Sequence, residues 1–196
     1  MNGTELIGLA ASISLMAGWR IYLCIFVTGL AMRMGWIALP HHLAALDALA
    51  NPWVLGIAAF GLLAEFFVDK IAWLDSIWDA LHTLARPVGG ALLAMAIVDA
   101  DDPAWQIASL LLGGSAALLG HGAKAGIRAA INASPEPFSN IAASSGEDFV
   151  TAVLLALAIA YPAIAIVIAI VLATVAIAMI VVLIRLLRRL KRPKTG

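Results

Sequence analysis

Residues 149–184 read FVTAVLLALAIAYPAIAIVIAIVLATVAIAMIVVLI, and this stretch decides the fold because it contains no charged residue, amide or histidine. A helix needs about 20 apolar residues to cross the hydrocarbon core of a bilayer. The whole chain is 63% hydrophobic and 12% charged, with a mean hydropathy of +1.02. In ordinary water-soluble domains, about a quarter of all residues are charged. The sequence therefore predicts an all-α, polytopic membrane helix bundle that forms a single domain over residues 1–196.

This apolar stretch is too long for one crossing. A helix from Phe149 to Leu187 would extend nearly 60 Å at about 1.5 Å per residue, against a core about 30 Å thick. Tyr161-Pro162 is the natural break, because proline interrupts a helix. We expect a re-entrant half-helix at about 149–161, followed by a span at about 163–187.

Prolines and capping residues divide the rest of the chain. Asn51-Pro52 and Asp102-Pro103 have the pattern of helix starts, and the stretch RPVGG (residues 86–90) is expected to end the helix before it. The expected elements are spans at about 4–34, 52–72, 88–100 and 104–130, with a polar helix at about 75–86.

The charge distribution predicts the topology. The tail RLLRRLKRPKTG follows the last apolar run, and basic residues beside a span stay on the cytoplasmic side. The C-terminus is therefore expected inside. Five full crossings would place the N-terminus outside. The N-terminal segment lacks the basic region of a secretory signal, so we expect it to be retained as part of the first span.

A short internal similarity suggests an inverted repeat. LMAGWRIYL (residues 15–23) and AKAGIRAAI (residues 123–131) share Ala-Gly-x-Arg. Three spans in a first repeat, at about 1–100, and two in a second, at about 104–190, would insert with opposite orientations. Interrupted apolar segments and inverted repeats are typical of transporters. The motif is short enough that chance similarity remains an alternative.

A basic stripe follows in HGAKAGIRAAINASPEPFSN, residues 121–140. Four polar residues lie on one face of the predicted helix, and two more lie in or after the turn that follows it. They are His121, Lys124, Arg128, Asn132, Glu136 and Asn140. A base near the middle of the membrane costs at least about 2.5–3.5 kcal/mol. One alternative is that the helix ends near Ala123 and Lys124 and Arg128 reach the lipid headgroups. The other is that these two bases form a buried site. Arg20, near the centre of its own apolar helix, favours the buried site.

The acidic partners lie in EFFVDKIAWLDSIWDALHTLARP, residues 65–87. On one helical wheel an arc of about 140° collects the polar residues, while Lys70 points elsewhere. The arc contains Glu65, Asp69, Asp75, Ser76, Asp79, His82 and Arg86. Glu65 and Asp69, and likewise Asp75 and Asp79, are acids four residues apart on a helix, and such like-charge pairs destabilise it. Protons, a cation or the bases must therefore offset this repulsion. We expect Arg20, Lys124 and Arg128 to face Glu65 and Asp69. The alternative is a surface helix at 75–86 with Asp75 as its N-cap.

Several kinds of site are excluded or disfavoured. Cys24 is alone, so no disulfide or thiolate metal site is available. His41-His42 has no third ligand at metal spacing, and Ser115 lacks a nucleophile-elbow pattern. No phosphate-binding loop, dinucleotide fingerprint or zinc-protease motif occurs. We expect no cofactor, no metal and no nucleic-acid partner.

Three blocks carry a resemblance to a known family: AGWRIYL, EFFVDKIAWLDSIWDALHTLARP and GHGAKAGIRAAINASPEPFSN. They resemble the signature blocks of small bacterial inner-membrane proteins catalogued as domain of unknown function 4126. The resemblance covers about residues 17–148, with Ala72 standing where the family pattern has proline. It implies a bacterial inner-membrane protein and supplies no activity.

The leading hypothesis is a small transporter or channel for an ion or for an anionic or phosphate-bearing substrate, with coupling to protons or a cation as an option. It is not expected to be an enzyme. The alternatives are a structural or accessory subunit, and an intramembrane enzyme using Asp75, Asp79 and His82. Because Gly122 and Gly126 have the spacing of a close helix contact, we also expect a homo-oligomer, most simply a dimer, in the lipid bilayer.

Overall fold

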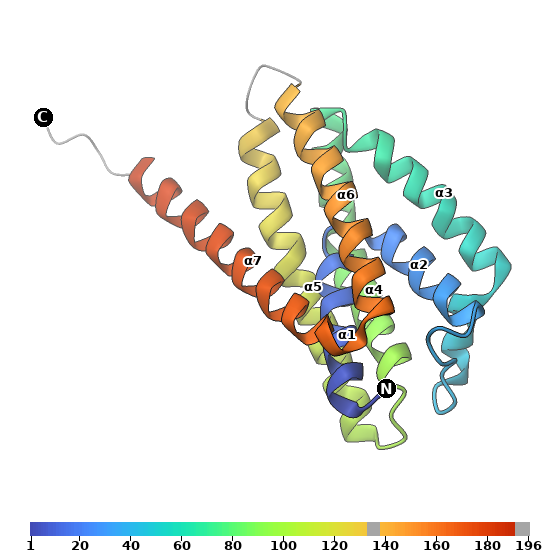
Figure 1. Ribbon diagram of the computed structural model, residues 1–196. Helices are drawn as coiled ribbons and strands as arrows, with labels where there is room; N and C mark the ends of the chain where they lie inside the picture. The colour runs from blue at the N-terminus through green and yellow to red at the C-terminus, as the bar shows by residue number, and fades with distance from the viewer. Residues whose placement is uncertain (133–137, 191–196) are drawn as a thin grey trace, which may run out of the picture.

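Every element of the computed structural model is a helix within the residues it describes, 1–132 and 138–190 (Figure 1). The elements are α1 (Gly3–Ala17), α2 (Ile21–Arg33), the 3-10 helix η1 (Ala44–Ala50), α3 (Pro52–Val68), α4 (Ala72–Val98), α5 (Pro103–Asn132), α6 (Phe138–Ala160) and α7 (Pro162–Leu190). The prediction of an all-α bundle is confirmed.

The helices are long and apolar enough for a multi-pass membrane protein. Helices α4, α5, α6 and α7 can each cross a bilayer, and η1 with α3 can form a fifth, bent crossing at 56°. Large apolar side chains cover the outside of these helices, as Trp53, Phe60, Leu111 and Ile170 illustrate. Outward apolar side chains are what a lipid environment requires.

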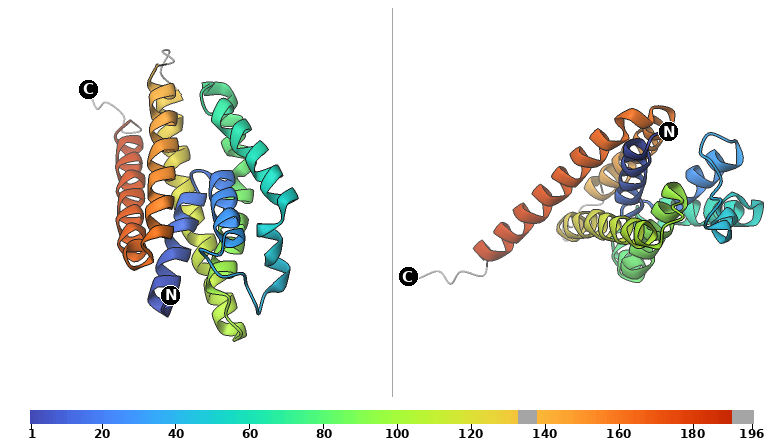
Figure 2. Two further views of the ribbon diagram at one scale, coloured as in Figure 1. Left: turned by 45° about the vertical axis from the view of Figure 1, so that its right-hand side comes forward. Right: turned by 90° about the horizontal axis from the view of Figure 1, so that it is seen from below.

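The expected first span at 4–34 is wrong, because two short helices replace it. Helix α1 has 15 residues and α2 has 13, so at about 1.5 Å per residue each is shorter than the hydrocarbon core. The chain turns at Gly18–Arg20, and α2 runs back toward the end of the bundle where α1 begins (Figures 1 and 2). We call this pair the re-entrant hairpin, residues 3–33, with Arg20 at its tip.

The expected half-helix at 149–161 is also wrong. Helix α6 has 23 residues and extends back to Phe138, long enough to cross. Its first turns precede the expected half-helix, and Asn140 and Ser144 in these turns face the interior of the bundle and are buried. The break at Tyr161-Pro162 is confirmed, because α6 ends at Ala160 and α7 begins at Pro162.

Helix α4 corrects a third expectation. The polar helix at 75–86 and the span at 88–100 are one helix of 27 residues that continues through Pro87. A proline in a helix removes one backbone hydrogen bond and bends the helix without always ending it. The helix begins at Ala72, so Asp75 lies in its first turn and is not its N-cap.

The two predicted helix starts are confirmed. Asn51 accepts a hydrogen bond from the Trp53 amide at 2.9 Å, with Pro52 in the first turn of α3. Asp102 accepts one from the Ala104 amide at 2.7 Å at the start of α5. Both side chains satisfy amides that have no partner inside the helix.

Helix α1 lies at the centre of the bundle and packs against α4, α5 and α7 (Figure 2). Glycines allow two of the closest approaches. A Cβ on Gly120 would lie 2.3 Å from the Leu15 carbonyl oxygen, and a Cβ on Gly90 would lie 2.4 Å from Ala117 Cβ. Only a residue without a side chain lets these backbones meet.

The apolar core and the buried charged groups occupy opposite halves of the bundle. The core gathers at the end where α1 begins, from residues such as Leu9, Ile13, Leu93, Leu155 and Ala165. The buried charged groups gather between the hairpin tip and the other end, where α3, α5 and α7 finish and α4 and α6 begin (Figure 1). An apolar layer therefore separates the polar half from the end that carries the N-terminus.

Candidate functional site, a buried charge cluster

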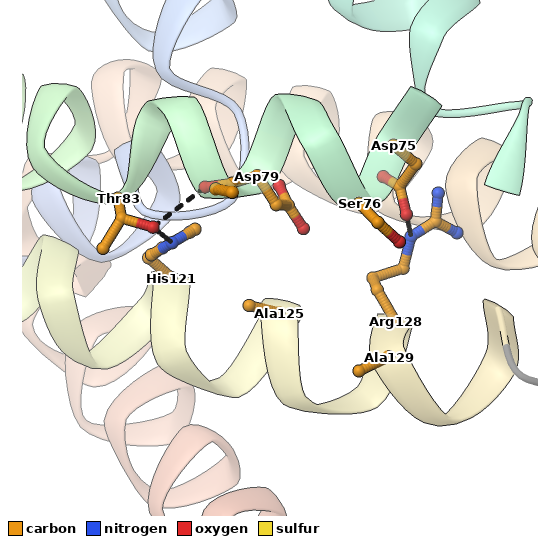
Figure 3. Close-up of a pocket in the computed structure, with 9 residues that line it drawn as sticks. Asp75, Ser76, Asp79, Thr83, His121, Ala125, Arg128 and Ala129 are labelled. Atoms are coloured by element: carbon orange, nitrogen blue, oxygen red, sulfur yellow. Dashed lines mark hydrogen bonds and ion pairs between the residues drawn. The ribbon is translucent and has the colours of Figure 1, made fainter. Parts of the chain in front are cut away.

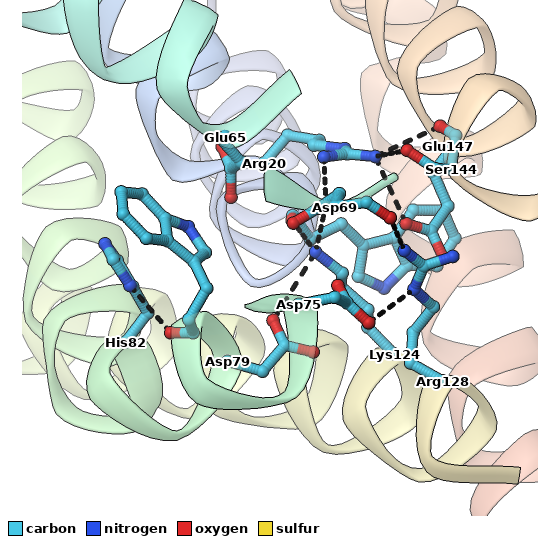
Figure 4. A network of polar contacts seen from close by, with 12 residues as sticks. Arg20, Glu65, Asp69, Asp75, Asp79, His82, Lys124, Arg128, Ser144 and Glu147 are labelled. Atoms are coloured by element: carbon cyan, nitrogen blue, oxygen red, sulfur yellow. Dashed lines mark hydrogen bonds and ion pairs between the residues drawn. The ribbon is translucent and has the colours of Figure 1, made fainter. Parts of the chain in front are cut away.

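The predicted acids and bases meet inside the bundle (Figure 4). Eight buried ionisable side chains form what we call the charge cluster: Arg20, Glu65, Asp69, Asp75, Asp79, Arg86, Lys124 and Arg128. Three half-buried ones, Lys70, Glu147 and Asp148, lie at its edge. They come from the hairpin tip, α3, α4, α5 and α6.

Asp69, at the end of α3, joins the hairpin tip to α5. Its carboxylate binds the Arg20 guanidinium, and its Oδ2 lies 2.9 Å from Lys124 Nζ. Lys124 also donates to the Trp19 carbonyl at 3.3 Å and lies 3.5 Å from Asp79 Oδ1. The arrangement of Arg20 and Lys124 around Asp69 agrees with the sequence analysis.

Arg86 is a buried base that the sequence analysis placed on the polar arc but did not assign to the site. Its Nη2 lies 2.9 Å from Glu65 Oε1, and its Nη1 lies 2.7 Å from Asp79 Oδ1. It is fully buried, and it connects α3 to α4. The signal was present, because Arg86 falls on the same arc of the helical wheel as the acids.

Arg128 binds three elements at once. Its Nε lies 3.1 Å from Asp75 Oδ2, its Nη1 donates to the Asn140 carbonyl at 3.0 Å, and its Nη2 donates to the Asp69 carbonyl. The Asn140 amide also donates to that Asp69 carbonyl, at 3.1 Å. Lys124 and Arg128 are only 2% and 1% exposed, so the alternative in which these bases reach the headgroups is wrong.

Helix α6 contributes residues to the edge of the charge cluster that the sequence analysis did not identify. Arg20 donates to the Ser144 carbonyl at 3.0 Å and pairs with Glu147 at 3.3 Å and Asp148 at 3.1 Å. Lys70, expected to point away from the acidic arc, pairs with Asp148 of α6, at 3.3 Å.

His82 lies beside the cluster in an aromatic group. Its ring stacks on Trp78 at a centroid distance of 4.3 Å, and its Nε2 lies 3.0 Å from the Tyr22 hydroxyl. The Trp78 carbonyl can only accept, so the 2.8 Å contact places a proton on His82 Nδ1. Tyr22 and Trp78 had no assigned role in the sequence analysis.

A pocket of about 230 Å³ opens between α4 and α5, next to the cluster (Figure 3). Asp75, Asp79, His121 and Arg128 contribute polar groups to its lining. Ala80, Ala125 and Ala129 make the space, because side chains this small leave a gap between the helices. Asp79 and Arg128 therefore belong both to the cluster and to the lining of this pocket.

The charges of the cluster and its edge do not balance. The acids are Glu65, Asp69, Asp75, Asp79, Glu147 and Asp148, and the bases are Arg20, Lys70, Arg86, Lys124 and Arg128. Within the described residues, acids therefore exceed bases by one when all are ionised. No group of three or more His, Cys, Asp or Glu side chains in this part of the chain is arranged for a metal ion.

Two predicted site residues and the repeat stay untested. Glu136 lies outside the described residues, and so does the side chain of Asn132. The first Ala-Gly-x-Arg ends α1 at the hairpin turn, whereas the second lies inside the continuous α5. Both arginines nevertheless contact Asp69, Arg20 through the carboxylate and Arg128 through the carbonyl. The inverted repeat remains a prediction.

Comparison with known proteins identifies the family without adding an activity. No curated protein and no solved structure matches the chain. Residues 7–182 match the family described as Domain of unknown function (DUF4126), which covers most of the sequence. On this match, the chain, whose apolar helices are those of a multi-pass membrane protein, belongs to that family.

Proposed function

We propose that the protein is a small membrane transporter or channel, and that the charge cluster binds the ion or charged solute that crosses. The observation that carries this proposal is a cluster of eight buried ionisable side chains, four acids and four bases, next to a pocket. Charged side chains within the membrane are costly and usually mark an ion or substrate pathway.

Stability alone does not explain such a cluster. Replacing buried ion pairs by apolar residues of similar volume is often neutral or stabilising, so a purely structural bundle gains little from them. The re-entrant hairpin adds to the argument, because interrupted helices near the midplane are typical of transporter sites. The apolar half of the bundle closes the site from the N-terminal end, which fits a pathway that opens to one side at a time.

The contacts favour a cation or proton over an anion at the cluster. Arg86, Lys124 and Arg128 each contact a carboxylate. A phosphate-bearing substrate would have to displace one of these acids, whereas a cation or proton would offset the excess of one acid that the cluster and its half-exposed edge carry together. We therefore assign the cluster to ion binding or ion coupling.

The location is part of the same proposal. We place the protein in a bacterial inner membrane with its C-terminus in the cytoplasm, on the basis of the family blocks and the basic end of α7. The polar half of the bundle then opens toward the cytoplasm.

Flux into proteoliposomes tests the proposal. The probes are Na⁺, K⁺, chloride and phosphate as tracers, with a trapped pH-sensitive dye for protons. We expect flux of at least one probe above that of empty vesicles, loss of that flux in Lys124→Gln, and parent-like flux in Arg188→Gln, an exposed base on α7. Parent flux equal to empty vesicles for every probe would contradict the proposal and favour a structural or accessory subunit.

A further inference from the structure

We propose that the groove between the C-terminal parts of α5 and α7 binds one acyl chain of an anionic phospholipid, whose phosphate group lies at Arg185 and Arg189. This site lies outside the charge cluster, and it binds its lipid whether or not the protein transports an ion. The shape of the groove, its length and the bases beside it all support a lipid.

The groove lies where α5 and α7 separate. The two helices touch where Gly126 faces Leu183, since a Cβ on Gly126 would lie 2.4 Å from Leu183 Cδ2. Toward their C-terminal ends the helices splay apart, and α7 points away from the rest of the bundle (Figures 1 and 2). A groove of about 530 Å³ lies between them. Small side chains such as Ala130 on α5 and Ala178 on α7 leave this space.

The lining of the groove is apolar and has the length of one leaflet. Its side chains are those of alanine, isoleucine, leucine, methionine and valine, and on α7 they lie between Val175 and Leu186. At about 1.5 Å per residue, this part of α7 is about 16 Å long. The hydrocarbon core is about 30 Å thick, so one leaflet contributes about 15 Å. The groove therefore matches an acyl chain in the leaflet where α5 and α7 end.

Two arginines continue the face of α7 that lines the groove. Arg185 follows Ala178 by about two helical turns, and Arg189 follows Val182 in the same way, so each lies on the side of a lining residue. Both arginines are exposed. Arg188 is also exposed, but it lies about 100° around the helix from Arg189, on a face turned away from the groove. Guanidinium groups match the geometry of phosphate, and basic sites between membrane helices bind anionic headgroups.

A second copy of the chain suits this groove less well than a lipid. Most homodimers are twofold symmetric, and a twofold axis perpendicular to the membrane brings identical ends of α7 together. Two α7 helices packed across the groove would place both copies of Arg185, Arg188 and Arg189 side by side, where like charges repel. Apolar helix faces also gain no hydrophobic free energy by exchanging lipid for each other. An anionic lipid fills the groove and offsets the charge of the bases.

Native mass spectrometry of the full chain in a neutral detergent tests the site. Titration gives the dissociation constants of phosphatidylglycerol, which is anionic, and of phosphatidylcholine, which is zwitterionic. Each base near a headgroup contributes about fivefold in affinity. We therefore expect phosphatidylglycerol to bind about 25-fold more tightly than phosphatidylcholine, because two bases face the phosphate.

Matched variants separate a defined site from general attraction to negative charge. Arg189→Gln should weaken phosphatidylglycerol binding about fivefold, and adding Arg185→Gln should lower it to that of phosphatidylcholine. Arg188→Gln removes the same charge on another face and should stay close to the parent. Ala130→Leu should weaken lipid binding by filling the groove, whereas Ala152→Leu on α6 should not. All these positions are exposed, so the variants should fold.

Four results overturn the proposal. Equal affinity for the two lipids would remove the role of the phosphate, and equal losses in Arg188→Gln and Arg189→Gln would show only diffuse attraction. Parent-like lipid binding in Ala130→Leu, with or without a changed dimer fraction, would show that no acyl chain occupies the groove. Displacement of the bound lipid by inorganic phosphate alone would show a site for the ion and not for the lipid.

Discussion

Arg86 and His121 lie on adjacent helices with Arg86 Nη1 2.8 Å from His121 Nδ1, and this contact determines the tautomer of the histidine. Arginine can only donate, so Nδ1 must accept and the ring proton must be on Nε2. The other side agrees, because Thr83 Oγ1 donates to the Asp79 carbonyl at 3.0 Å and can accept from His121 Nε2 at 3.2 Å. His121 therefore connects Arg86 of the cluster to Thr83 in the pocket as a neutral ring.

This geometry predicts the behaviour of two substitutions at His121. Glutamine keeps an acceptor for Arg86, whereas leucine leaves a buried guanidinium group without it, at a cost of about 1–3 kcal/mol. We expect His121→Leu to lower the free energy of unfolding by about that amount relative to His121→Gln. Thermal unfolding in one detergent measures the difference, and ¹⁵N spectra of the parent should show a neutral ring protonated at Nε2. A doubly protonated ring would contradict the assignment.

The pair Arg86–Glu65 should be strongly coupled. Removing one partner of a buried ion pair typically costs about 3–5 kcal/mol, so we expect Arg86→Met to destabilise the protein by that amount. Glu65→Gln should recover part of the loss when combined with Arg86→Met, because Glu65 Oε1 is 2.9 Å from Arg86 Nη2. A double-mutant cycle on thermal stability measures the coupling. Additive effects would show that the two charges do not interact, and Asp101→Asn is the matched control outside the cluster.

Gly120 should be intolerant of a side chain. A Cβ there would lie 2.3 Å from the Leu15 carbonyl oxygen, so Gly120→Ala should push α1 away from α5 and cost about 1–3 kcal/mol. Gly56 on α3 has no atom within 4 Å of its Cβ position and is the matched control. Gly56→Ala should be neutral or stabilising by about 0.4–1 kcal/mol. Equal effects of the two changes would argue against the close contact between the hairpin tip and α5.

The termini should label from opposite sides of the membrane. The N-terminus and the end of α7 lie at opposite ends of the bundle, and the hairpin returns to the side where it begins (Figures 1 and 2). Cys24 is fully buried, so it should give little background with a membrane-impermeant thiol reagent. Cysteines introduced at Gly3 and Arg189 should react from opposite sides, the latter from the cytoplasm. Labelling of both from one side would contradict the hairpin.

A homodimer remains a prediction, and its contact should not involve Gly126. A Cβ on Gly126 would lie 2.4 Å from Leu183 Cδ2 of α7, so this small-residue face is occupied within one chain. We expect Gly126→Ala to lower thermal stability without changing the dimer fraction, which mass measurements in nanodiscs report. A monomer mass for the parent in nanodiscs would contradict the dimer, and a loss of dimer in Gly126→Ala would contradict the assignment of this face.

The main features of the site were predictable from local patterns. Helical spacing places His121, Lys124 and Arg128 on one face, and the cost of charge in a membrane requires acidic partners for them. The partner assignments were less accurate, because Arg128 was expected opposite Glu65 and Asp69 but its side chain pairs with Asp75, contacting Asp69 only through the backbone. Which acid meets which base depends on how α3, α4 and α5 rotate against one another, and no spacing within one helix contains that information.

The sequence by itself determined the membrane environment, the helical class and the composition of the cluster, since apolar length and helical periodicity are properties of consecutive residues. The tertiary structure decided where helices end. Residues 4–34 are apolar enough for a single helix, yet the chain turns at Gly18–Arg20, where α1 meets the backbone of α5 and Arg20 binds Asp69. Residues 138–148 lie outside every span that the sequence predicted, yet they form the start of α6, where Arg20 and Arg128 bind their carbonyls and a carboxylate. Contacts between distant segments set these boundaries, because buried polar groups must find partners wherever the packed helices provide them.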